Sequence, residues 1–217
     1  TKKRLENKFK AKKFIVYFQS FTNTYAPLST LKSLYEKALS FDDVIGLSIG
    51  TRTDCVTDEI LDFLYEKSKQ KEIWIEYGIQ SFFQTTLDKI NRADDVENMR
   101  YWIKRTKYKG LNVCGHLIYG LPDENQEMML ETFKQTIDLK VDSIKFHPLY
   151  VVKNTLLTNE FKKGRFNPIS EELYMDTVVQ SIINLPQNVS VQRVTAGIDD
   201  DTLLSPLWCK NKHQQMK

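Results

Sequence analysis

The chain has few cysteines and no long apolar run, and each of these shortages excludes a class of protein. Its three cysteines, Cys55, Cys114 and Cys209, are odd in number and far apart. That pattern excludes a disulfide framework and a local cysteine metal site. The longest apolar runs have the length of a strand and no signal peptide precedes them, so we expect no membrane insertion. We therefore expect a cytoplasmic protein in a reducing compartment.

The chain also has little net charge. A net charge of +3 over 217 residues gives no reason to expect a polyanionic partner. Only the segment Thr1–Lys13 is strongly basic, with seven lysines and arginines against Glu6. One interpretation is an arm that binds RNA. The interpretation that we favour is a solvated helix with Leu5 and Phe9, four residues apart, on its buried side, because no aromatic residues alternate with the lysines to stack on bases.

What the sequence does contain is a regular alternation of strand and helix patterns. Short β-branched and aromatic runs predict strands, and apolar residues at helical spacing lie between them. The expected strands cover 14–18, 44–49, 73–79, 113–119, 143–146 and 189–194. Strands that alternate with helices require right-handed crossovers and a mostly parallel sheet. Because no repeat, low-complexity tract or linker interrupts this pattern, we expect a single α/β domain, either a partial barrel or an open sheet.

In parallel α/β folds, ligands bind beyond the carboxyl ends of the strands. Polar residues at those ends are therefore the candidates for a site. They are Ser20, Thr22, Asn23, Arg52, Glu76, Gln80, His116, Lys145 and His147. Gly120 belongs with them, because a glycine at a strand end lets a planar ligand approach the backbone, and the next helix offers free N–H groups.

Two of these candidates have alternative explanations. Glu76 is a carboxylate in an apolar strand, which is costly unless it binds a ligand or pairs with Arg52 or Lys145. His116 points inward if it shares a face with Ile118, and only that orientation serves a ligand.

Several segments taken together resemble the radical-SAM superfamily. They are GTRTD at 50–54, EYGIQS at 76–81, INR at 90–92 and HLIYGLP at 116–122. Their order and spacing are similar to the branch that contains the Elongator catalytic subunit and the oxygen-independent coproporphyrinogen oxidases. With IKFHPL at 144–149 and SPLWC at 205–209, the chain also resembles the YhcC-type Fe-S oxidoreductases, from about residue 14 to residue 209.

The resemblance implies a partial (β/α)6 TIM-like barrel that binds S-adenosylmethionine and a 4Fe-4S cluster and generates a 5′-deoxyadenosyl radical. An electron donor and a substrate, which the resemblance does not identify, are the implied partners. Residues 1–13 would end the first barrel helix, 14–195 would form the β/α repeats and 196–217 a C-terminal tail. The superfamily's CxxxCxxC loop is not in the sequence, so we expect the cluster ligands upstream of residue 1 and an inactive fragment as given.

The resemblance also implies roles for individual residues. Gln80 and Arg92, twelve residues apart, match the glutamine and arginine that contact S-adenosylmethionine in the oxidase branch. His116 occupies an adenosine-site position, and Gly120 would flank the adenine. The remaining contacts implied for the cofactor site are Glu76, Ser20, Thr22 and Asn23 at the methionine end, with Arg52 and His147 at neighbouring strand ends.

Two other classes of function stay open at this point. A barrel hydrolase or isomerase would hold one divalent metal ion with Glu76, His116 and His147. A non-catalytic module would bind RNA through the segment Thr1–Lys13 and would lose affinity as salt is raised.

Overall fold

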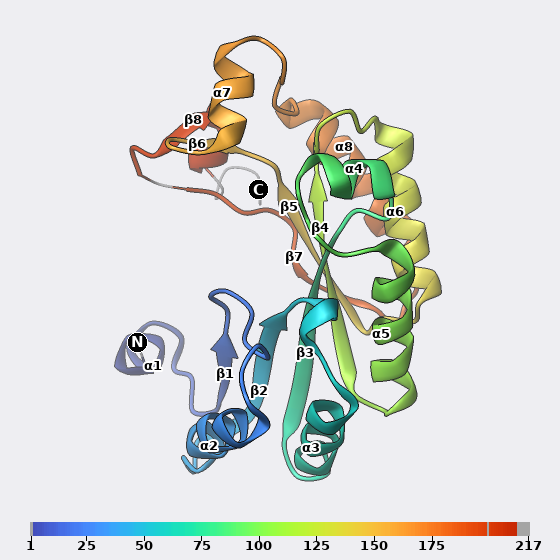
Figure 1. Ribbon diagram of the computed structural model, residues 1–217. Coiled ribbons are helices and arrows are strands. Elements are labelled where there is room, and N and C mark those ends of the chain that lie inside the picture. Colours follow the sequence, from blue (N-terminus) through green and yellow to red (C-terminus); the bar gives the residue numbers. More distant parts are fainter. Residues whose placement is uncertain (1, 199, 212–217) are drawn as a thin grey trace. The chain divides into compact units, whose positions relative to one another are not determined.

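A computed structural model describes residues 2–198 and 200–211 of the chain (Figure 1). The chain divides into two compact units. Unit 1 comprises Thr1–Gly78 and Arg100–Cys114, and unit 2 comprises Ile79–Met99 and Gly115–Lys217. The expected single-domain organisation stays a prediction.

The elements follow the order that the sequence predicts, and each of the six expected strands forms. Unit 1 and the elements that the unit bounds divide are α1 (Lys2–Phe9), β1 (Phe14–Phe18), α2 (Leu28–Leu39), β2 (Val44–Thr51), η1 (Thr53–Cys55), α3 (Asp58–Ser68), β3 (Glu72–Gln80), α5 (Val96–Tyr108) and β4 (Asn112–Tyr119). Unit 2 adds α4 (Gln84–Lys89), α6 (Gln126–Asp138), β5 (Ser143–Pro148), β6 (Val151–Val152), α7 (Leu156–Lys162), α8 (Glu171–Ile183), β7 (Ser190–Arg193), β8 (Leu203–Ser205) and η2 (Leu207–Asn211). The strand order is β1-β2-β3-β4-β5-β7, and β6 and β8 form a separate two-stranded sheet.

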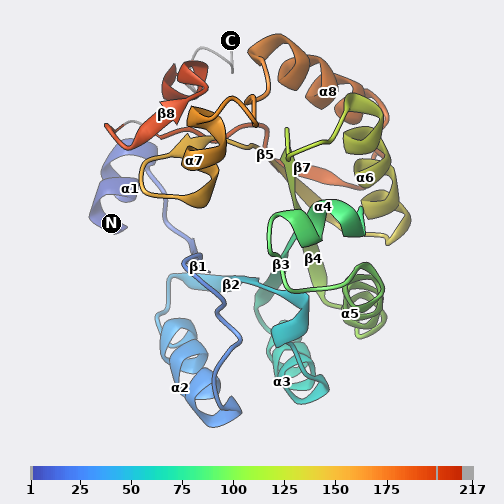
Figure 2. The ribbon, with the colours of Figure 1, turned by 45° about the horizontal axis from the view of Figure 1, so that its top comes forward.

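Unit 1 is built on the parallel pairs β1/β2 and β2/β3. Helices α2 and α3 lie side by side against these strands (Figures 1 and 2). Leu47 and Ile49 of β2 are fully buried, as is Leu61 of α3. The strands approach closely at Gly46, where a Cβ atom would lie 2.1 Å from the carbonyl oxygen of Glu72. Only glycine fits at that position without a shift of the backbone.

Unit 2 contains the parallel pair β5/β7, the antiparallel pair β6/β8, and the helices α6 and α8, which pack against one another (Figure 2). The ring of Tyr119 in β4 lies 5.4 Å from that of Phe146 in β5, and its hydroxyl shares a hydrogen bond of 2.7 Å with Ser181 of α8. These two side chains therefore face α8. Because successive side chains of a strand alternate, His147 lies on the opposite face of β5.

The basic segment at the amino end corrects one expectation. It forms a helix, α1, but none of its residues is buried, and Phe9 is 64% exposed. The expected buried side with Leu5 and Phe9 is therefore wrong, because Leu5 is only half-buried and Phe9 is exposed. An ion pair between Lys2 and Asp43 connects the helix to the turn before β2.

None of the helices in the described part of the chain has the length and apolarity needed to cross a bilayer.

Candidate functional site

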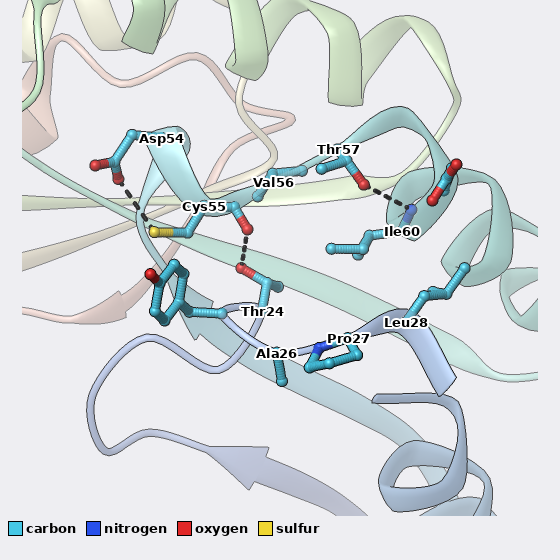
Figure 3. Close-up of a pocket in the computed structure, with 11 residues that line it drawn as sticks. Thr24, Ala26, Pro27, Leu28, Asp54, Cys55, Val56, Thr57 and Ile60 are labelled. Atoms are coloured by element: carbon cyan, nitrogen blue, oxygen red, sulfur yellow. Dashed lines mark hydrogen bonds between the residues drawn. The ribbon is translucent and has the colours of Figure 1, made fainter. Parts of the chain in front are cut away.

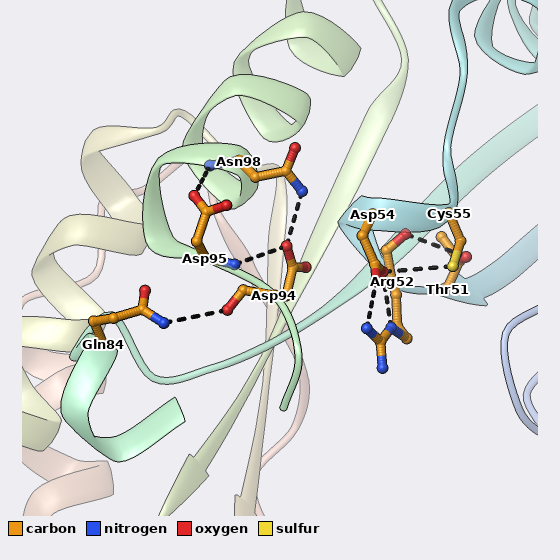
Figure 4. Close-up of polar contacts among 8 residues, drawn as sticks. All are labelled: Thr51, Arg52, Asp54, Cys55, Gln84, Asp94, Asp95 and Asn98. Carbon is orange, nitrogen blue, oxygen red and sulfur yellow. Dashed lines mark hydrogen bonds and ion pairs between the residues drawn. The ribbon is translucent and has the colours of Figure 1, made fainter. Parts of the chain in front are cut away.

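Glu76 of β3 is the buried carboxylate of unit 1, with 2% of its surface exposed. The hydroxyl of Tyr17 in β1 donates to its Oε2 at 2.8 Å, and the hydroxyl of Ser48 in β2 donates to its Oε1. Two hydroxyl donors offset much of the cost of burying a carboxylate. Arg52, one of the two expected ion-pair partners, forms an ion pair with Asp54, which it contacts with Nε at 2.8 Å and with Nη2 (Figure 4).

The segment after β1 is held by its own hydrogen bonds. The side-chain amide of Asn23 donates to the carbonyl oxygens of Phe18 at 3.0 Å and of Gly50 at 2.9 Å, so it joins the ends of β1 and β2. The hydroxyl of Tyr35 in α2 donates to the carbonyl oxygen of Asn23 at 2.5 Å. Both hydrogens of the Asn23 amide are therefore used within the chain. Of the other expected contacts here, Ser20 is exposed and Thr22 is half-buried.

A pocket of about 530 Å³ lies beside this segment, at the amino ends of α2 and α3 (Figure 3). Pro27 and Ile60 contribute to its apolar wall, and Asp54 and Glu59 give it an acidic side. The hydroxyl of Thr24 closes one side, where it donates to the carbonyl oxygen of Cys55 at 2.6 Å. The sequence analysis did not predict this pocket. Helices α2 and α3 follow the parallel strands β1 and β2, so the amino ends of both helices lie at the same edge of the sheet.

Gln80 ends β3 and belongs to unit 2. Its backbone has a φ of 68°, in the left-handed region that residues other than glycine rarely adopt. The side chain is half-buried, and no hydrogen bond holds its amide among the residues that the structure describes. A strained residue at a strand end with an unused amide is typical of a ligand site.

Arg92 lies in the loop between α4 and α5. Both of its sequence neighbours have a positive φ, 54° and 51°. Gln84 closes the loop, because its Nε2 donates to the carbonyl oxygen of Asp94 at 3.5 Å (Figure 4) and its Oε1 accepts from the backbone N–H of Val96 at 3.1 Å. The backbone N–H of Arg92, twelve residues after Gln80, donates to the carbonyl oxygen of Leu87 at 2.9 Å and so positions its backbone.

Gly120 has a φ of 86°, and a Cβ atom there would lie 2.7 Å from the Cβ of Ile169. Its backbone N–H donates to the sulfur of Met129 at 3.1 Å. Internal packing therefore already requires a glycine. Further along the chain, the carboxyl of Glu124 accepts a hydrogen bond from the hydroxyl of Ser81, and burial raises the pKa of this carboxyl.

His147 has a defined tautomer. Its Nδ1 lies 2.7 Å from the carbonyl oxygen of Pro148, and since a carbonyl can only accept, Nδ1 carries the hydrogen. Burial, together with the charges of Arg193 and His116, lowers the pKa of His147 to about 4, although the hydrogen bond to the Pro148 carbonyl opposes this shift. The ring is therefore neutral at pH 7, with Nε2 as an acceptor. His116 is half-buried like Ile118 on the same face of β4, which supports the inward orientation.

Sequence reasoning missed Arg193, the last residue of β7. Its Nε is buried without a hydrogen-bond partner among the described residues. It is the register partner of Lys145 of β5, next to a register shift between Ile144 and Lys145. A charged residue at the end of the last expected strand was the available signal, but no motif marked it.

The three cysteines do not form a cluster site. Cys114 and Cys209 are buried and Cys55 is half-buried. Among the residues that the structure describes, no three cysteine sulfurs gather within reach of one metal centre.

Comparisons with known proteins cover most of the chain. A family model described as the Radical SAM superfamily matches residues 2–136, and one described as the Radical_SAM C-terminal domain matches residues 141–217. Protein YhcC of Escherichia coli strain K12 is 40% identical over 204 residues, which are 94% of this chain and 66% of YhcC. The chain thus spans about two thirds of the length of this relative.

Two solved structures have a similar fold. The archaeal Methanocaldococcus infernus Elp3 with an N-terminal deletion superposes with a TM-score of 0.81 at 20% identity, over 99% of this chain and 56% of that one. Coproporphyrinogen III oxidase (HemN) from Escherichia coli gives a TM-score of 0.59 at 20% identity, over 80% and 40%. The expected fold class, an α/β partial (β/α)6 barrel, is thereby confirmed.

Proposed function

This chain belongs to the radical SAM superfamily, and from that premise we propose that it forms the S-adenosylmethionine-binding core of an Fe-S oxidoreductase that generates a 5′-deoxyadenosyl radical. The superfamily's enzymes use S-adenosylmethionine and a 4Fe-4S cluster. When bound, the cluster supplies the electron that cleaves the sulfonium C–S bond. Membership of this family favours the hypothesis over the metal-dependent hydrolase and the RNA-binding module.

The observation that carries the proposal is the state of Gln80 and Arg92. The Gln80 amide has a donor and an acceptor that the described residues leave unused, on a strained backbone that holds the side chain at the strand end. Arg92 follows twelve residues later, and its backbone N–H donates to the carbonyl oxygen of Leu87 at 2.9 Å. A carboxamide and a guanidinium fit the polar groups of S-adenosylmethionine, because the amide both donates and accepts and the guanidinium matches a carboxylate.

The other expected contacts stay proposals. We assign His116 and Gly120 to the adenosine, and the methionine end to Glu76, Ser20, Thr22 and Asn23, with Arg52 and His147 nearby. Asn23 and Arg52 already hold structural hydrogen bonds, so any contact with the cofactor would come from their remaining atoms.

Cys55, Cys114 and Cys209 do not fit the CxxxCxxC spacing that holds the superfamily's 4Fe-4S cluster. We therefore place the cluster ligands upstream of residue 1 and propose that the chain as given does not generate the radical. Strand β1 supports this placement, because it lies at the edge of the sheet and exposes Ile15 and Tyr17, as a strand does that another segment covers. We further propose a cytoplasmic enzyme that needs an electron donor, with RNA among the candidate substrates.

The test uses the full-length gene product, reconstituted anaerobically with iron and sulfide and supplied with S-adenosylmethionine and a reductant. The measurement is the rate of 5′-deoxyadenosine formation. Gln80→Ala and Arg92→Ala should each lower the rate roughly tenfold or more, the loss expected for a hydrogen bond to a charged group.

Matched controls in unit 2 are Gln180→Ala, at a half-buried position of α8, and Arg165→Ala, at an exposed position. Failure of the reconstituted full-length protein to form 5′-deoxyadenosine would overturn the proposal. Equal rates in all four variants would reject the assigned roles of Gln80 and Arg92.

A further inference from the structure

Gln80 is the central residue of a tight turn at the end of β3. The backbone N–H of Ser81 donates to the carbonyl oxygen of Ile79 at 2.9 Å, and the φ of Gln80 between them is 68°. A hydrogen bond between residues two apart around a positive φ defines the rare, strained form of the γ-turn. Such a conformation persists only where the surrounding structure enforces it. The contacts that enforce this turn therefore determine where the Gln80 side chain lies.

Ser81, the residue after the turn, is held from several sides. It is fully buried, and its hydroxyl donates to Oε1 of Glu124 and accepts from the backbone N–H of Phe83 at 3.1 Å. The next backbone N–H, that of Phe82, donates to the hydroxyl of Thr132 in α6 at 3.2 Å. The contact with Glu124 joins the γ-turn to the loop that follows β4.

Glu124 and its neighbour Asp123 are two carboxylates with different surroundings. Asp123 is exposed and forms a surface ion pair with Lys89 of α4. Glu124 is half-buried, and the side chains of Ser81 and Thr86 are its hydrogen-bond partners. Burial raises the pKa of the Glu124 carboxyl, whereas both contacts lower it, so they favour the charged form. A hydrogen bond to a charged carboxylate is stronger than one between neutral groups, which suits Glu124 to hold a strained turn.

We propose that Glu124 is a positioning residue, which binds the Ser81 hydroxyl and thereby holds the γ-turn that presents the Gln80 amide to S-adenosylmethionine. The inference rests on the proposed function, in which Gln80 contacts this cofactor. Glu124 acts through Ser81 and does not touch the cofactor. Its removal should therefore cost no more affinity than removal of the Gln80 amide itself.

The first experiment tests whether Glu124 holds the turn. Exchange of the Ser81 backbone N–H with solvent deuterium is followed by NMR on the full-length protein. Glu124→Ala should raise the exchange rate of this N–H roughly tenfold or more, because the hydrogen bond to Ile79 opens when the turn relaxes. Asp123→Asn is the matched control in the same loop and should leave the rate unchanged. Glu124→Gln keeps an oxygen that accepts from Ser81 and should retain most of the protection.

The second experiment tests whether the effect reaches the cofactor through Gln80. Calorimetry on the reconstituted full-length protein gives the Kd of S-adenosylmethionine for Glu124→Ala, Gln80→Ala and the double variant. Glu124→Ala should raise the Kd roughly fivefold or more, within the loss that Gln80→Ala causes. The double variant should bind like Gln80→Ala alone, because residues that act as one unit are not additive. A purely structural role of Glu124 predicts additive losses instead.

Ser81→Ala is the second variant, which decides the question should Glu124→Ala fail to fold. It removes the hydroxyl that joins Glu124 to the turn, so it should raise the Kd as Glu124→Ala does and be equally non-additive with Gln80→Ala.

Two results would overturn the inference. One is exchange of the Ser81 N–H at the same rate in Glu124→Ala and Asp123→Asn. The other is a loss of affinity that adds to that of Gln80→Ala. Failure of the proposed function has a different signature, since the wild-type protein would then form no 5′-deoxyadenosine while the exchange experiment still reports whether Glu124 holds the turn.

Discussion

The strand ends of unit 1 and those of unit 2 carry similar numbers of polar side chains but differ in how these are bonded. In unit 1, Glu76 accepts from two hydroxyls and Asn23 donates to two backbone carbonyls. In unit 2, the amide of Gln80 and the Nε of Arg193 have no partner in the described part of the chain. Because buried polar groups are nearly always hydrogen-bonded, a buried group without a partner, such as the Nε of Arg193, is a candidate for a ligand contact. A polar residue at a strand end is therefore a weaker sign of a ligand site than an unsatisfied one.

The same comparison separates the site residues predicted from the sequence into those that have a structural role and those that do not. Arg52 is bonded to Asp54, and the space next to Gly120 is filled by Ile169. Each of these residues has a structural explanation, whereas the side chain of Gln80 has no hydrogen bond that explains it in residues 2–198 and 200–211.

Gly120→Ala should have the largest effect and would show whether unit 2 also contains purely structural positions. The new Cβ would meet Ile169 at 2.7 Å on a backbone with a φ of 86°. We expect the free energy of unfolding to fall by about 3 kcal/mol, from overpacking and a disfavoured φ together. Urea denaturation measures it. The control is Gly164→Ala, which has a positive φ but open space and should cost about 1 kcal/mol. Equal losses would show that Ile169 does not constrain this position.

Asn23→Ala tests whether the bonded network of unit 1 is structural. Removal of the amide leaves the carbonyl oxygens of Phe18 and Gly50 without this donor. The free energy of unfolding should fall by about 2 kcal/mol, measured by urea denaturation. Ser20→Ala, at an exposed position of the same segment, should change it by less than about 0.5 kcal/mol. Unchanged stability together with lost S-adenosylmethionine binding would instead make Asn23 a cofactor ligand.

His147 gives unit 2 a dependence on pH. Its pKa is lowered from 6.5 to about 4 by burial, so the unfolded chain binds a proton more readily between these values. The stability that the neutral ring contributes is complete above pH 6.5 and is lost as pH falls through 4. Between pH 7 and pH 5 we expect a loss of roughly 1–2 kcal/mol.

The measurement for His147 is the difference in unfolding free energy between the wild type and His147→Asn at each pH, since asparagine can keep a donor to the Pro148 carbonyl. An NMR titration of the ring gives the pKa directly. A pKa near 6.5 would contradict the assignment of a neutral, buried ring.

Arg52→Ala should have the smallest effect. The ion pair with Asp54 is partly exposed, with 28% and 31% of the two side chains accessible. Its loss should cost less than about 1 kcal/mol. Binding of S-adenosylmethionine, measured by calorimetry on the reconstituted full-length protein, should change little if Arg52 belongs to the bonded network. A large loss of affinity would instead indicate that Arg52 contacts the cofactor.

The local elements of the fold are predictable because their signals are local. Thr57 and Ser170 cap α3 and α8, because their hydroxyls accept from the backbone N–H groups of Ile60 at 3.4 Å and Leu173 at 3.1 Å. Gly110 has a φ of 82° just after α5, as a helix stop requires. By contrast, the β6/β8 pair joins short segments about fifty residues apart, and no local pattern marks them.

By itself, the sequence determined the alternation of strands and helices and, through its ordered motifs, the radical SAM family. These depend on periodicity, capping and residue order, which are properties of neighbouring residues. Only the tertiary structure decided which polar groups satisfy one another: that Glu76 accepts hydrogen bonds from Tyr17 and Ser48, and that the Nε of Arg193 has no acceptor among the described residues. Hydrogen-bond satisfaction depends on side chains from different strands and on their burial, and a linear sequence does not contain those distances.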